Sequence, residues 1–149
     1  MSGEARGEDG DLEVRCGRDR TAGVSLTDRQ EDDGLVRFTV RLRAPGLTAR
    51  LADVVDLAPD VGLAGFLAAL AADFRGWAGE RSWHNADGDL ALRAVFRSGG
   101  HVDLTWALRP WRAADGDWRA EATTRLEAGE QLAALAAEVA AFLDGGGRG

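Results

Sequence analysis

Residues 74–83 read FRGWAGERSW, and they lie where a predicted amphipathic helix ends and a predicted run of antiparallel strands begins. Gly76 occupies the position where a helix closes with a left-handed residue, a conformation that only glycine adopts without a Cβ penalty. Trp77 is expected to fold back on Ala71 or Ala72 as the apolar lid of this cap. The stretch therefore predicts a hinge between helix and strand.

The segment before the hinge has the apolar spacing of a helix, i, i+3, i+4, i+7 and i+11. These positions are Leu63, Phe66, Leu67, Leu70 and Phe74. Asp60 as N-cap, or Pro59 as first helical residue, is predicted to open this helix. Gly62 and Gly65 each lower its intrinsic helicity by up to about 1 kcal/mol, so packing against a sheet must hold it.

Alternating apolar residues before the helix predict a first set of strands. They indicate a short strand at 12–16, a weaker one at 23–26 and, after a polar loop at 27–34, a clear strand at 36–43. The apolar face of this clear strand consists of Val36, Phe38, Val40 and Leu42. Pro45 and Gly46 then favour a type II turn. The partner strand continues with Leu47, Ala49 and Leu51.

A second set of strands follows the hinge. A turn at 85–88 precedes two strands joined by a hairpin at 98–100, and a longer connection at 110–117 leads to a third strand at 118–126. The inward positions are Leu90, Leu92, Ala94, Phe96, Val102, Leu104, Trp106, Leu108, Trp118, Ala120, Ala122, Thr124 and Leu126. A final helix has one apolar stripe and stops at Gly145. That stripe is Leu132, Leu135, Ala136, Val139, Phe142 and Leu143.

The order strands–helix–strands–helix predicts an α+β fold. Short turns within each strand set require antiparallel pairing, because parallel pairing needs long crossovers. We therefore expect an antiparallel twisted sheet in two strand sets, with the two amphipathic helices packed on one face. Residues 11–144 are predicted to form a single domain. Residues 1–10 are predicted to be a disordered segment and residues 145–149 a flexible Gly-rich tail.

Composition and charge exclude several classes of function. The chain has a net charge of -7, and its 18 basic residues are all arginine. The sequence contains no basic stripe that would predict nucleic-acid binding. It also contains no run of about 18 apolar residues that would predict a membrane span. The first residues lack the apolar core of a signal peptide, so we expect a cytoplasmic protein. Cys16 is the sole cysteine, which excludes an intrachain disulfide and a cysteine zinc site. Because Cys16 alternates with apolar residues, its side chain is expected to be a small buried hydrophobic group and not a nucleophile.

Motifs of catalysis are missing from the sequence. It contains no P-loop, no G-x-G-x-x-G and no G-x-S-x-G. His84 and His101 adjoin predicted turns, and acidic residues near them would complete a metal or acid–base cluster. These acidic residues are Glu80, Asp87, Asp89 and Asp103. No histidine spacing typical of a metal site supports such a cluster, and turns collect Asp for ordinary reasons. We therefore predict no catalytic, cofactor-binding or metal-binding residue.

Tryptophan is the most unusual feature of the composition, with five residues. Trp106 is predicted to lie in the core. Trp77, Trp83 and Trp118 are predicted to cap the open ends of the core, where an indole N–H can reach water. Trp111, in the loop 110–117, is equally consistent with a structural role and with a binding anchor. This acidic and aromatic loop provides the candidate protein-binding residues Trp111, Arg112, Asp115 and Asp117.

Four short stretches carry a resemblance to a known family: residues 74–83, 88–90 (GDL), 100–102 (GHV) and 128–132 (AGEQL). From about Phe38 to Phe142 the chain resembles a family of small uncharacterised actinobacterial proteins, a domain of unknown function. This family has no established activity, so the resemblance implies no catalytic residues. The layout and the G-x-[IV] hairpin return are also similar to those of immunity proteins that neutralise bacterial toxins.

Three functions are consistent with the sequence. The first is a non-enzymatic protein-binding module that occludes a partner protein with acidic and aromatic surface; the second resemblance implies an immunity-like form of this function. The second is a small enzyme, which a deep pocket holding both His84 and His101 would favour. The third is a self-associating structural protein, which a broad apolar patch on the outer sheet face would favour. No oligomeric state is predicted.

Overall fold

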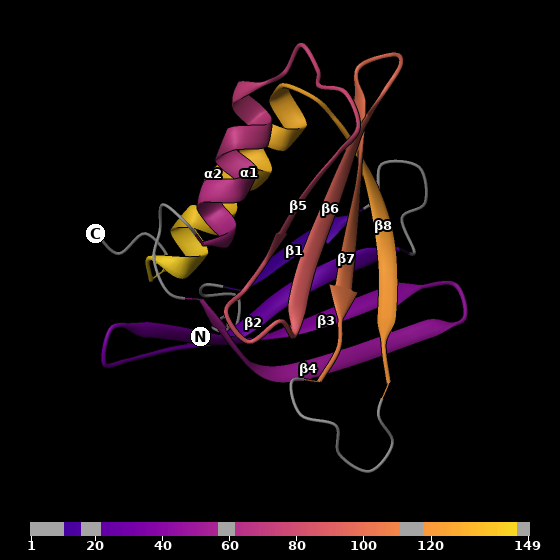
Figure 1. The fold of residues 1–149 in the computed structure, drawn as a ribbon. Helices are drawn as coiled ribbons and strands as arrows, with labels where there is room; N and C mark the ends of the chain where they lie inside the picture. Colours follow the sequence, from indigo (N-terminus) through magenta and orange to yellow (C-terminus); the bar gives the residue numbers. More distant parts are fainter. Residues whose placement is uncertain (1–10, 16–21, 57–61, 111–117, 146–149) are drawn as a thin grey trace, which may run out of the picture.

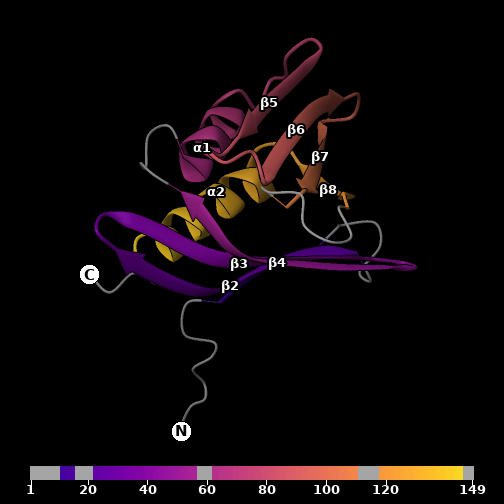
Figure 2. The same cartoon turned by 60° about the horizontal axis from the view of Figure 1, so that its bottom comes forward.

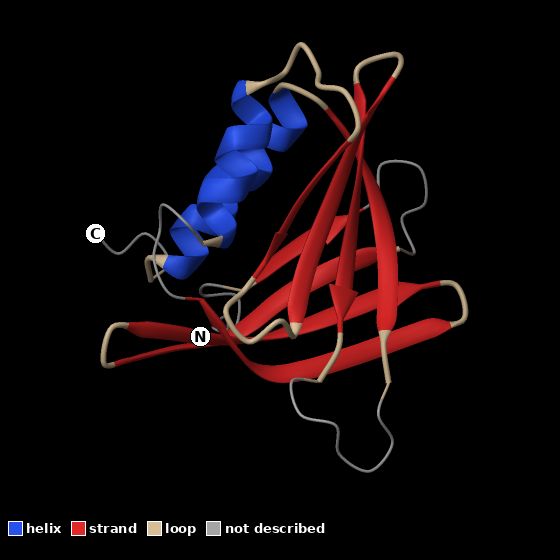
Figure 3. Ribbon diagram, viewed as in Figure 1, coloured by secondary structure: helices blue, strands red, loops and turns tan. Residues whose placement is uncertain are grey.

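In the residues that a computed structural model describes, the fold consists of two four-stranded antiparallel sheets and two helices (Figures 1 and 3). The structure describes residues 11–15, 22–56, 62–110 and 118–145. The elements are β1 (Leu12–Arg15), β2 (Gly23–Asp32), β3 (Leu35–Ala44), β4 (Leu47–Asp56), α1 (Leu63–Ala72), β5 (Glu80–His84), β6 (Leu90–Arg97), β7 (His101–Leu108), β8 (Ala120–Glu127) and α2 (Glu130–Leu143).

The first sheet has the order β1-β2-β3-β4. Its central strand β3 buries the predicted residues Phe38, Val40 and Leu42. The predicted polar loop at 27–34 is wrong for residues 27–32, because β2 continues to Asp32 and pairs with β3 on both sides of an irregularity between Thr27 and Gln30; only residues 33–34 form a turn. This end of β2 is polar on both faces and has no buried side, so it lacks the alternation by which a strand is recognised in a sequence.

Two bulges interrupt the register of the first sheet. They occur at left-handed residues, Asp28 in β2 (φ 58°) and Asp53 in β4 (φ 60°). The bulge in β4 adds one residue opposite β3, so that Val54 pairs with Phe38 and lies in the core. Asp56, the last residue of β4, is thereby also buried.

The second sheet has the order β5-β6-β7-β8. The predicted inward residues of β6 and β7 are buried, Phe96 only partly, and Trp106 is fully buried as predicted. Trp118 is predicted as the first inward residue of the third strand, but β8 begins only at Ala120 and the Trp118 side chain is 37% exposed. β5 is not recognisable in the sequence, because it is a short edge strand with half-buried residues at alternate positions.

Helix α1 is shorter than predicted. It ends at Ala72, so Phe74 lies beyond it and is 53% exposed. The helix begins at Leu63, whose backbone N–H donates a hydrogen bond to Oδ2 of the buried Asp56 at 3.2 Å. The predicted opening residues Pro59 and Asp60 lie outside the described residues. The end of β4 therefore provides a carboxylate for the start of α1.

Gly76, in the hinge between α1 and β5, has a positive φ of 112° as predicted, but it does not close the helix, because α1 ends at Ala72 with Asp73 as its C-cap. Trp77 does not form a lid on the helix. Its ring packs edge-on against Phe96 of β6, with the centroids 5.4 Å apart, and its Nε1 donates to the carbonyl oxygen of Ala94 at 3.4 Å. Arg81 covers the indole, with Cζ 4.7 Å from the ring centroid. Trp77 therefore fixes the hinge to the second sheet.

One hydrophobic cluster contains buried residues from both sheets and both helices. Figures 1 and 2 show the helices side by side, with α2 close to the first sheet. Phe142 of α2 meets Phe38 of β3 edge-on at 5.8 Å. The predicted α+β class and antiparallel pairing are confirmed, but the two strand sets form two separate sheets, because a helix rather than a turn joins β4 to β5. Neither described helix has the length and apolar character of a membrane span.

Candidate functional site on the outer face of the second sheet

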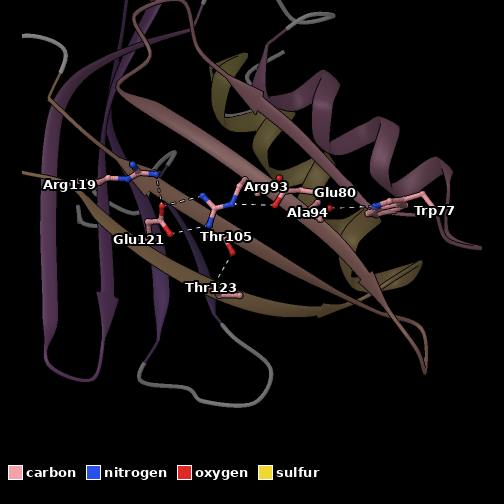
Figure 4. Close-up of polar contacts among 8 residues, drawn as sticks. All are labelled: Trp77, Glu80, Arg93, Ala94, Thr105, Arg119, Glu121 and Thr123. Atoms are coloured by element: carbon pink, nitrogen blue, oxygen red, sulfur yellow. Dashed lines mark hydrogen bonds and ion pairs between the residues drawn. The ribbon is translucent and has the colours of Figure 1, made fainter.

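Charged side chains cover the outer face of the second sheet and pair with one another across its strands (Figure 4). Alternation along each strand explains their position, since their sequence neighbours on β6, β7 and β8 point into the core. We call this surface the charged face. It consists of Glu80, Arg93, Arg97, Asp103, Arg119, Glu121 and Arg125.

Arg93 and Glu121 form the first centre of the charged face. Nη1 and Nη2 of Arg93 donate to the two carboxylate oxygens of Glu121 at 3.1 and 3.0 Å, a bidentate pair. Glu80 of the edge strand β5 lies 3.4 Å from Nε of Arg93, and Arg119 donates to Glu121 at 2.9 Å. Four charges of alternating sign therefore extend from β5 to β8 (Figure 4).

Asp103 of β7 forms the second centre. Nε of Arg125 donates to its Oδ1 at 2.8 Å, and Nε of Arg97 donates to its Oδ2 at 2.9 Å. Between the two centres, the hydroxyl groups of Thr105 and Thr123 share a hydrogen bond of 2.8 Å (Figure 4). The polar pairs thus form a continuous band over β6, β7 and β8.

The carboxylates of the charged face hold fixed negative charges. Hydrogen bonds from Arg125, and then from Arg97, lower the pKa of Asp103 against the opposing effect of its burial. Hydrogen bonds from Arg93, and then from Arg119, lower the pKa of Glu121 in the same way. A carboxyl whose pKa is lowered stays ionised at neutral pH, so it is a poor proton donor. This face therefore presents ionised carboxylates and guanidinium groups, which can form ion pairs and hydrogen bonds, and not a proton donor.

The two histidines do not form a common site. His84 pairs with Ala91 near the start of β6, and His101 pairs with Arg97 at its end. Six residues of strand separate these positions, which is roughly 20 Å. Both side chains are exposed, and Nδ1 of His84 lies 2.8 Å from the carbonyl oxygen of Asn85. This separation prevents the two histidines from lining one deep pocket. Such a shared pocket is the feature that would favour an enzyme.

The acidic residues near the histidines also lie in different places. Glu80 and Asp103 belong to the charged face, whereas Asp89 is 5% exposed and accepts a 2.6 Å hydrogen bond from Nδ2 of Asn85. Among the residues with a described position, no group of three or more His, Cys, Asp or Glu could hold a metal ion. Cys16 lies outside the described ranges.

The Asn85–Asp89 pair is a polar junction that the sequence does not reveal. Nδ2 of Asn85 also donates to the carbonyl oxygen of Val55 in β4 at 3.1 Å, and Oδ1 of Asn85 accepts from the N–H of Leu90 at 3.1 Å. The junction therefore links the turn before β6 to the first sheet. Burial raises the pKa of Asp89, and the hydrogen bond from Asn85 opposes this.

The predicted protein-binding residues Trp111, Arg112, Asp115 and Asp117 lie outside the described residues. Their loop leaves β7 after Leu108 and enters β8 at Ala120, so both of its ends belong to the second sheet. Trp118 and Arg119, at the described end of this loop, are both exposed, and Arg119 belongs to the charged face.

A family model covers almost the whole chain. The model of a family of unknown function, DUF6228, matches residues 15–146. The chain belongs to this family. The match confirms the predicted relation to a domain of unknown function and extends it beyond the predicted range of Phe38 to Phe142. No curated protein and no solved structure matches the chain.

Proposed function

We propose that this family member is a non-enzymatic protein-binding module whose binding surface is the charged face together with the loop 110–117. The observation that carries this proposal is the network of ion pairs across β5 to β8. Its charges alternate in sign and are held by rigid strands, so a partner meets a prearranged pattern. Complementary charge patterns give a protein interface its specificity and its rate of association.

The loop 110–117 would complete this surface with anchors of a different kind. Trp111 and Arg112 are residue types that dominate the binding energy of protein interfaces. They adjoin the charged face in the chain, because the loop connects β7 to β8. The exposed Trp118 adds apolar area next to Arg119. We propose that an apolar anchor beside an ordered charged band is the arrangement that the partner recognises.

The partner is proposed to be a basic protein, and the action an immunity-like occlusion of its surface in the cytoplasm. A net charge of -7 attracts a basic protein over long range and increases the rate of encounter. Occlusion requires only binding, and the fixed charges of Asp103 and Glu121 are suited to binding rather than to proton transfer.

A pull-down from a lysate of the source cells with quantitative identification of the captured proteins tests this function. The parent chain should capture a protein that Trp111→Ala/Arg112→Ala no longer captures, while the thermal melt stays nearly unchanged. His84→Ala/His101→Ala is the matched control and should capture the same protein as the parent. The opposite pattern, with the histidines essential and the loop dispensable, would replace the binding module with the enzyme hypothesis.

A further inference from the structure

Two arginines face each other on the outer side of the first sheet. Arg41 of β3 and Arg50 of β4 are direct cross-strand partners, and both side chains are exposed. Their inward neighbours Leu42 and Leu51 contribute to the core, so the arginines point away from it. Figure 2 shows the helices and the second sheet on one side of the first sheet. Arg41 and Arg50 point away from the core, so by strand alternation they face the other side.

This pair differs from most of the arginines that the structure describes, which have a carboxylate partner. Arg43 and Arg37 on the same face pair with Glu13 and Asp32, and every arginine of the charged face has a carboxylate partner. In contrast, none of the described acidic residues pairs with Arg41 or Arg50. Like charges directly opposite each other in a sheet are destabilising.

We infer that Arg41 and Arg50 form a second binding surface, which takes an acidic segment of a partner protein. A carboxylate placed between two guanidinium groups would remove their repulsion, and guanidinium groups bind carboxylates with paired hydrogen bonds. Ser25 of β2 flanks Arg41 on the opposite side from Arg50 and adds a hydroxyl group to the surface. Nothing in this surface depends on the charged face of the second sheet.

Charge decides the class of occupant. The surface is a small basic area on a protein of net charge -7. A nucleic acid presents one phosphate charge after another along its backbone, so the acidic remainder of the protein would repel it. A short protein segment with a few carboxylates brings much less charge and can match two arginines alone. The surface therefore fits an acidic peptide better than a polyanion.

The test uses the full chain and a fluorescently labelled hexaglutamate peptide, with binding measured by anisotropy at low ionic strength. The parent chain should bind the peptide, and added salt should weaken the complex. Arg41→Gln/Arg50→Gln should lose affinity about tenfold or more, because both charged partners are removed. Arg75→Gln/Arg109→Gln, which removes two exposed arginines elsewhere, is the matched control and should bind like the parent.

A thermal melt separates binding from folding. Arg41→Gln/Arg50→Gln should melt at or above the temperature of the parent, because the repulsion between the two arginines is removed. Equal affinity of both double variants for hexaglutamate, or no binding by the parent, would overturn the inference. Tighter binding of a labelled oligothymidylate through the same arginines would overturn it as well, because the occupant would then be a nucleic acid.

Discussion

Arg125 of β8 donates to both carboxylate oxygens of Asp103 on the neighbouring strand β7, from Nε at 2.8 Å and from Nη2 at 3.3 Å. Asp103 also accepts from Arg97, so one carboxylate holds two arginines of the charged face in place. The Asp103 side chain is 16% exposed, which limits its screening by water. The order of this part of the face therefore depends on a single acidic residue.

Replacing this carboxylate should cost stability in a pH-dependent way. Asp103→Asn should lower the free energy of unfolding at neutral pH by about 1 kcal/mol, since hydrogen bonds to a charged group are lost from a partly screened site. The folded pKa of Asp103 is lowered from its ordinary value of 3.8, so this contribution is present above that value and is lost as the pH falls through the folded pKa.

Urea denaturation of parent and variant across this pH range measures the difference. The difference in the free energy of unfolding between the parent and Asp103→Asn should disappear in acid. Asp33→Asn, in the exposed turn between β2 and β3, is the control and should change the free energy of unfolding little. A difference between parent and Asp103→Asn that stays constant into acid would contradict the ion-pair explanation.

Asp89 should show the opposite pH dependence. Its folded pKa is raised from 3.8, mainly by burial, so the folded state holds a proton more tightly than the unfolded chain. The stability that protonation provides is therefore lost as the pH rises from 3.8 through the raised folded pKa. Asp89→Asn does not titrate, so its stability relative to the parent should increase over this window. Paired denaturation curves at several pH values test this, and a relative stability that decreases with pH would refute it.

Gly76→Ala should destabilise the hinge for two reasons. Gly76 has a φ of 112°, which strains any residue with a Cβ, and an added Cβ would lie 2.9 Å from Cε1 of Phe96. We expect a loss of about 1–3 kcal/mol in denaturant melts. Gly46→Ala is the matched control, because Gly46 also has a positive φ but nothing lies within 4 Å of its Cβ position. Equal losses in the two variants would show that the contact with Phe96 has no effect.

Arg29 should be important for the end of α2. Its Nε and Nη2 donate to the carbonyl oxygen of Leu143 at 3.1 and 2.9 Å, next to the negative end of the helix dipole. Arg29→Met should cost about 1–2 kcal/mol and increase amide hydrogen exchange in the last turn of α2. Arg37→Met, which removes an exposed ion pair with Asp32 at 3.7 Å, should change stability by less than about 0.5 kcal/mol. Unchanged exchange in Arg29→Met would exclude this capping role.

Much of the fold could be predicted because burial produces alternation. Val36 to Leu42 in β3 and Leu90 to Phe96 in β6 have one apolar and one polar face, and both strands form where that pattern predicts. The Gly-rich turn after Arg97 also fixes the register of β6 and β7, which places Arg93 beside Thr105. Alternation in the sequence therefore predicts which charged residues lie on the outer face. It does not predict which of them pair with β8, because the long loop 110–117, and not a short turn, joins β7 to β8.

The remaining features depend on contacts that no local pattern shows. The polar end of β2 is held by backbone pairing to β3, and the bulge at Asp53 puts Asp56 at the start of α1. Asn85 reaches Val55, thirty positions earlier in the chain, through a side-chain hydrogen bond. Trp77 packs on Phe96 instead of on the helix that precedes it. Each of these is a contact between two different elements of the fold.

The most direct test of the binding-module proposal is the affinity of the captured partner for a chain with the fourfold exchange Glu80→Arg/Arg93→Glu/Arg119→Glu/Glu121→Arg. The exchange retains all three ion pairs among these residues but reverses the charges that a partner meets. We predict that the partner binds this variant at least about tenfold more weakly than the parent, while the thermal melts of the two chains stay close. An unchanged dissociation constant in a folded variant would contradict the proposal that the charged face is the binding surface.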